Sequence, residues 1–173
     1  MHARRGSRPG ESSSVQARGV TAIRIPDISA RPYELTVERD FATTPTTLYQ
    51  AWTVGLDRWF AAPGSVLMRA AVNAVFFFET EFKPEGRPIV QRHPHYGRFL
   101  RLIVDQLVEL TWVTGAGGTD GAETVVTVEL QPIGHTTRLN LKHAGFAGEA
   151  ARDRHRQAWP LVLAQLDQRV VRR

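Results

Sequence analysis

The sequence predicts an α+β fold in which an antiparallel sheet of about seven strands packs against one long C-terminal helix. Two observations lead to this prediction. After residue 32, most segments alternate apolar and polar side chains with period two, which is typical of strands with one buried face. Residues 149–170 instead repeat apolar side chains every three or four positions, as an amphipathic helix does. A one-faced sheet must cover its apolar side, and this helix is the predicted element long enough to do so.

Residues 1–32 are predicted to be a disordered tail ahead of a single domain at residues 33–173. The tail is rich in Arg, Ser, Gly and Pro and has few large apolar side chains. Such a composition cannot bury enough surface to offset the entropy of ordering the chain. Two interpretations stay open: a weak electrostatic arm, or an upstream extension from a mis-chosen start codon, with Val20 as an alternative start.

The domain is predicted to begin with one strand and two short helical segments. Residues 33–41 alternate apolar and polar side chains, which predicts a half-buried strand. Thr44 can cap a helix, and Pro45 suits its first position, so a helix is expected over residues 46–54. A further short helical turn is expected over residues 56–60.

Six more strands are expected, over residues 65–69, 75–82, 97–104, 107–114, 124–130 and 136–143. Four glycines between residues 115 and 121 predict a flexible turn before the last two strands. Those two strands alternate strictly, so one set of their side chains should share the inner face of the sheet: Thr124, Val126, Val128, Leu130, Thr137, Leu139, Leu141 and His143.

The C-terminal segment, residues 149–170, is predicted to be a helix with one apolar stripe. At 1.5 Å per residue it would extend about 33 Å, enough to cross a sheet of this size. Pro160 lies inside it and removes one backbone hydrogen bond, so a kink or a locally opened turn is expected there. The stripe consists of His155, Trp159, Val162, Leu163, Leu166 and Val170.

The composition argues against several classes of function. The chain has no cysteine, which excludes disulfides, thiol nucleophiles and Cys-ligated zinc. Of the net charge of +5, residues 1–32 carry +4, so the domain offers no basic stripe for nucleic acid. The longest nearly apolar stretch, residues 70–78, is too short to span a membrane. We therefore expect a cytoplasmic protein that binds neither nucleic acid nor membrane.

Residue patterns for hydrolysis, nucleotide binding and metal binding are weak. Ser65, the only serine after residue 32, lacks the surroundings of a nucleophile elbow. No glycine-rich loop precedes a helix as a phosphate site requires. His93 and His95 have no carboxylate or third histidine near them in sequence, which favours a surface loop over a metal site. We expect no catalytic residue, no metal and no cofactor.

His143 is the titratable side chain that alternation places on the inner face. Its imidazole, with an ordinary pKa near 6.5, could orient a polar ligand atom or transfer a proton. Alternatively, it could be a buried histidine bonded to backbone that anchors the end of the strand. The sequence leaves both interpretations open.

Inward-facing aromatic residues are the strongest indication of function. Alternation or helical spacing directs most of them toward the interior, where aromatic rings favour apolar or ring-shaped ligands if a cavity is present. The alternative is that they fill the core. The expected ligand-binding residues are Trp59, Phe76, Phe78, Trp112, His143 and Trp159.

Four segments carry a resemblance to a known family: residues 51–60, 97–112, 137–146 and the Trp159-Pro160 pair. With these motifs, residues 33–170 resemble the bacterial members of the activator-of-Hsp90-ATPase-homologue family, within the START-related, birch-pollen-allergen-like superfamily. The resemblance implies a helix-grip fold, in which a curved antiparallel sheet surrounds a long C-terminal helix and an apolar cavity. The chain departs from the family where Ala158 replaces a common glycine.

The resemblance implies several activities, because this superfamily carries binding, cyclase and co-chaperone roles on one scaffold. We favour the binding or sequestration of a small apolar or aromatic molecule by a monomer or weak homodimer. The alternatives are a cyclase- or hydrolase-type enzyme with His143 as the proton-transfer group, and a co-chaperone-like protein interaction. The sequence shows no convincing nucleophile or carboxylate pair, which favours binding.

Overall fold

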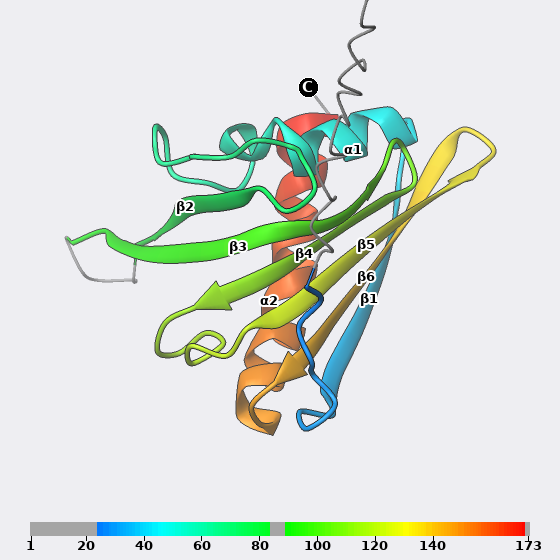
Figure 1. Ribbon diagram of the computed structural model, residues 1–173. Helices are drawn as coiled ribbons and strands as arrows, with labels where there is room; N and C mark the ends of the chain where they lie inside the picture. The colour runs from blue at the N-terminus through cyan, green and yellow to red at the C-terminus, as the bar shows by residue number, and fades with distance from the viewer. Residues whose placement is uncertain (1–23, 84–88, 172–173) are drawn as a thin grey trace, which may run out of the picture.

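The computed structural model describes residues 24–83 and 89–171, which form the predicted α+β fold (Figure 1). Their strands make one antiparallel sheet in the order β1-β6-β5-β4-β3-β2. The sheet curves around the long helix α2, which lies across one face (Figure 1). In chain order the elements are β1 (Tyr33–Phe41), α1 (Pro45–Thr53), η1 (Leu56–Arg58), β2 (Val75–Phe82), β3 (Gln91–Ile103), β4 (Leu107–Thr114), β5 (Thr124–Ile133), β6 (Thr136–Phe146), α2 (Glu149–Leu166) and η2 (Asp167–Val171).

Three strands have the bounds that the sequence predicts, and two others are longer. β1, β2 and β4 begin and end at the expected residues, and β5 and β6 each extend three residues further than expected. The predicted inner-face residues of β5 and β6 are all buried. Helix α1 begins where expected because the Thr44 hydroxyl accepts a hydrogen bond from the Thr47 backbone N–H, at 3.3 Å.

The prediction of a strand over residues 65–69 is wrong, so the described residues form six strands. Leu67 makes a single bridge to Phe77, with two backbone hydrogen bonds of 2.8 and 2.9 Å. On either side of this bridge the chain turns away from β2, with positive φ at Gly64 (73°) and Asn73 (65°). Leu67 remains 69% exposed, since no second layer covers it.

Strand β3 begins at Gln91, six residues earlier than expected, and the surface-loop interpretation of His93 and His95 is therefore wrong. Residues two apart on a strand share a face, and the His95 side chain is buried. Strand β4 ends opposite His95, so the part of β3 around Pro94 pairs with β2 on one side only. Pro94 has no N–H to donate and is tolerated there because one side of the strand needs no hydrogen bond.

The long C-terminal helix runs from Glu149 through Pro160 to Leu166 and continues as the π-helical turn η2. Helix α2 packs over β1 and β6 with buried Ala151, Trp159, Leu163 and Leu166. The core lies between this helix, α1 and the inner face of the sheet. No helix in residues 24–83 or 89–171 is both long enough and apolar enough to span a membrane.

The outer face of the sheet is partly covered by residues 24–32, which precede β1. Ile28 packs on Gly145, whose φ of 87° and close approach leave no room for a side chain. Arg31 donates a hydrogen bond of 2.8 Å to the backbone carbonyl of Glu123. Residues 1–23 of the predicted disordered tail lie outside the described residues, so the tail and the domain boundary at residue 32 stay predictions.

Two truncations test the contribution of residues 1–23 and that of residues 24–32 to stability separately. Removing residues 1–23 should leave the thermal midpoint within about a degree or two, because they offer few core-forming side chains. Removing residues 1–32 should lower it further by about 2–4 °C for each kcal/mol that Ile28 and Arg31 contribute. Calorimetry of both truncations and the full chain tests this expectation. Equal midpoints in all three proteins would show that residues 24–32 are dispensable.

Candidate functional site

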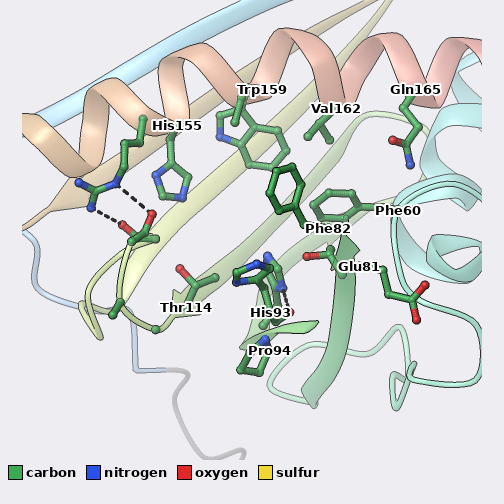
Figure 2. A pocket seen from close by; sticks show the side chains of 18 residues that line it. Phe60, Glu81, Phe82, His93, Pro94, Thr114, His155, Trp159, Val162 and Gln165 are labelled. Carbon is green, nitrogen blue, oxygen red and sulfur yellow. Dashed lines mark hydrogen bonds between the residues drawn. The ribbon is translucent and has the colours of Figure 1, made fainter. Parts of the chain in front are cut away.

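A cleft of about 660 Å³ lies between helix α2 and the β2–β3 side of the sheet. Figure 2 shows His155, Trp159 and Val162 projecting from the helix toward Phe60 and Phe82. This volume falls within the roughly 300–1,000 Å³ range of small-molecule sites. The cleft is bounded by Phe60, residues 80–82 of β2, residues 93–95 of β3, residues 114–118 and the α2 residues Arg154, His155, Ala158, Trp159, Val162 and Gln165.

Phe60 joins the cleft to the aromatic cluster beneath it. Its ring centroid lies 6.0 Å from that of Trp112, 6.5 Å from that of Trp159 and 5.8 Å from that of His95. The Phe60 and Trp112 rings are stacked, 22° from parallel. Since these rings come from α2, β3, β4 and the turn after η1, the wall of the cleft is held by packing from four parts of the chain.

His95 brings a polar atom into this aromatic surface. Its side chain is 8% exposed, and its ring stacks on Phe78 with centroids 4.7 Å apart. Nδ1 lies 2.9 Å from the backbone carbonyl of His93, which can only accept, so Nδ1 carries the proton. Burial lowers the pKa of His95 to about 4, so at neutral pH Nε2 is an unprotonated acceptor.

His155 presents the same arrangement from the helix. Its Nδ1 donates a hydrogen bond of 2.8 Å to the carbonyl of Ala151, one turn earlier. Burial lowers the pKa of His155, which leaves Nε2 as an acceptor. Among the described residues, no group bonds to Nε2 of His95 or to Nε2 of His155. Neither Nε2 atom is fully buried, so both keep some contact with solvent. Both acceptors are therefore open to the cleft that these residues line.

His143 is instead fully engaged inside the core. The Trp159 indole N–H donates to Nδ1 at 3.1 Å, so Nε2 carries the proton and donates to the Thr124 hydroxyl at 2.7 Å. Thr124 in turn donates to the carbonyl of Trp112 at 2.5 Å. Burial holds the pKa of His143 well below its usual value. Nδ1 thus connects β6 to α2, Nε2 connects β6 to β5, and His143 does not line the cleft.

Of the six residues that the sequence nominates for ligand binding, Trp159 lies on the cleft wall and the other five lie behind it. The Trp59 indole N–H donates to the Ala51 carbonyl at 2.9 Å, which turns this ring into the core and leaves Phe60 at the cleft. All six are buried: Trp59, Phe76, Phe78, Trp112, His143 and Trp159. Their role in ligand binding stays a prediction, with direct contact from Trp159 and support from the others.

Sequence reasoning missed Phe60, His95 and His155 as cleft residues. Alternation counted backward from Phe99 would place His95 on the inner face, but the predicted strand began only at residue 97. The sequence places His155 on the apolar stripe of the helix and suggests it only as a second proton-transfer group beside His143, not as a ligand-binding residue. Phe60 had no usable signal, because a short 3₁₀ turn does not impose one face on adjacent residues.

The glycine-rich segment at residues 115–121 forms the expected turn between β4 and β5, and hydrogen bonds hold it to its surroundings. The backbone N–H groups of Thr114 and Thr119 each donate to the other's hydroxyl, at 2.9 and 2.7 Å. Arg154 on α2 donates to the carbonyls of Gly117 and Gly118 and pairs with Asp120 at 2.9 Å. These contacts fix one rim of the cleft to the helix.

A metal site finds no support within residues 24–83 and 89–171. No group of three or more His, Asp or Glu side chains there is arranged to hold a metal ion.

Comparison with known proteins assigns the fold. The family model described as Activator of Hsp90 ATPase homolog 1-like protein matches residues 42–170. No curated protein matches the chain.

Solved structures from several bacteria share the architecture. A Chromobacterium violaceum protein is 22% identical with a TM-score of 0.67, over 80% of this chain and 98% of that one. The AHSA1 protein of Silicibacter pomeroyi is 25% identical with a TM-score of 0.63, over 79% and 96%. The Aha1 dimer of Colwellia psychrerythraea is 17% identical with a TM-score of 0.55, over 80% and 96%. These similarities establish the helix-grip architecture.

Proposed function

This chain belongs to the Activator of Hsp90 ATPase homolog 1-like family, and from that premise we propose that it binds a small apolar or aromatic molecule in the cleft beside α2. The observation that carries the proposal is the cleft of about 660 Å³ walled by Phe60, Phe82, Trp159 and Val162. Aromatic walls with few polar groups are typical of sites for small apolar ligands.

Proton transfer by His143, the alternative that the sequence left open, has less support. Its two ring nitrogens are engaged by Trp159 and Thr124, and burial disfavours its protonated form. A general acid or base needs a nitrogen within reach of the substrate. The geometry therefore supports the structural interpretation of His143 and the binding function of the cleft.

The other partner predictions are retained as part of this proposal. A monomer or weak homodimer in the cytoplasm is expected, and the related Colwellia psychrerythraea structure is a dimer. The cleft lies within one chain, so the proposed binding does not depend on a second copy.

Filling the cleft tests the proposed function. Val162→Phe adds bulk to a residue that lines the cleft, so its affinity for 1-methoxynaphthalene should fall about tenfold or more, equivalent to about 1.4 kcal/mol. Leu161→Phe is the matched control, because Leu161 is 73% exposed on the same helix and lies outside the cleft lining. Equilibrium dialysis measures both. Undetectable binding of both 1-methoxynaphthalene and 1-naphthol to the unmodified protein, or equal loss in both variants, would contradict the proposal.

A further inference from the structure

The cleft has a polar end formed by two histidines from opposite sides. His95 comes from β3 in the sheet and His155 comes from α2, and both line the same space. Burial is the main cause of the lowered pKa of His95, and the charge of His155 contributes a smaller part. The aromatic and aliphatic wall of Phe60, Trp159 and Val162 adjoins them (Figure 2).

We infer that the ligand carries at least one hydroxyl or N–H donor on its apolar or aromatic body, and that this donor bonds to Nε2 of His95 or His155. The inference rests on the proposed function and specifies the chemical class of ligand. In both histidines a backbone carbonyl takes the Nδ1–H, at 2.9 and 2.8 Å, so the atom left for a ligand is an acceptor.

Charge around the cleft disfavours an anionic ligand. Among the described residues that line the cleft, Arg154 is the only lysine or arginine. Its guanidinium is already bonded to Asp120 and to two loop carbonyls. Glu81 contributes a negative charge at the rim, where it pairs with Arg92 at 3.0 Å. Two neutral imidazoles offer lone pairs rather than positive charge. A neutral donor such as a phenolic hydroxyl fits this environment better than a carboxylate does.

An apolar ligand without a donor would leave these acceptors unpaired. Nε2 of His95 lies in a side chain that is 8% exposed, so filling the cleft would remove the water available to it. A buried polar group without a partner is costly, and sites built for a hydrogen bond discriminate strongly against analogues that lack it. The preference for a donor should therefore be large and should be lost when both acceptors are removed.

Matched ligands test the inference on the full-length protein. Equilibrium dialysis near pH 7.5 compares 1-naphthol, which has a hydroxyl donor, with 1-methoxynaphthalene, which has the same rings and no donor. We expect 1-naphthol to bind about tenfold or more tightly. The double variant His95→Phe/His155→Phe keeps aromatic bulk and removes both acceptors, so it should bind the two compounds with similar affinity. His135→Phe, at an exposed turn residue, should keep the full preference.

The outcomes separate this inference from the proposed function. If both compounds bind the unmodified protein equally, and Val162→Phe weakens the binding of both, the donor inference is overturned. The proposed binding in the cleft would then still stand. No binding of either compound would overturn the proposed function itself. Because the first comparison uses the unmodified protein, the inference can be tested even if the double variant does not fold. A preference that persists in a folded double variant would also overturn it.

Discussion

Replacing Trp112 with alanine is expected to lower the free energy of unfolding by about 3–5 kcal/mol, the cost of emptying a packed core. The Trp112 side chain is 3% exposed and its ring contacts Phe60, His95 and Trp159, with centroids 6.0, 5.0 and 5.6 Å away. The sequence left open whether this ring lines a ligand space. The structure places it one layer below the cleft, so its loss leaves a cavity in the core.

The measurement is urea unfolding followed by circular dichroism, with Tyr96→Ala as the control. Tyr96 is an aromatic residue on the adjacent strand β3 and is 49% exposed, so its replacement should cost about 1 kcal/mol or less. If Trp112→Ala costs no more than Tyr96→Ala, Trp112 borders a space that already exists, and the core-packing role described here is wrong.

Acidification from pH 7 toward pH 4 is expected to destabilise the protein through its buried histidines. The folded-state pKa of His95 is about 4, against 6.5 for an ordinary histidine. Between these values the unfolded chain takes up a proton that the folded chain excludes, so the free energy of unfolding falls as the pH falls. The loss from His95 amounts to roughly 3 kcal/mol by pH 4. His143 and His155 have lowered pKa values and act in the same direction.

Thermal unfolding at intervals between pH 7 and pH 4 measures this dependence. His95→Phe should reduce the slope, because it removes one group whose pKa differs between the two states. The lowered pKa values of carboxylates such as Asp40 affect stability at lower pH, below their ordinary value near 3.8. A thermal midpoint that stays constant from pH 7 to pH 4 would show that the imidazoles are not shielded from protonation.

The sequence by itself determined the strands and the faces they present. Alternation is a local property, so the bounds of β1, β2 and β4 and the inward direction of His143 could be read without knowing any partner strand. It failed where the outcome depended on pairing between distant segments. Residues 65–69 contain a short apolar run that resembles a strand, yet they meet β2 at one bridge. The predicted strand began at residue 97, whereas β3 begins at Gln91, because the end of β4 opposite His95 leaves that part of β3 free to accommodate Pro94.

The tertiary structure alone decided which inward-facing residues border the cleft. Helical spacing placed Trp159 and His155 on one stripe, and strand alternation placed Trp112 inward, but neither pattern gives the separation between the helix and the sheet. Helix α2 packs over β1 and β6, which leaves a space beside β2 and β3. Phe60 and His95 line that space, whereas Trp59 and Trp112 do not. A local pattern shows which way a side chain points, whereas the elements packed above it determine whether it meets core or ligand.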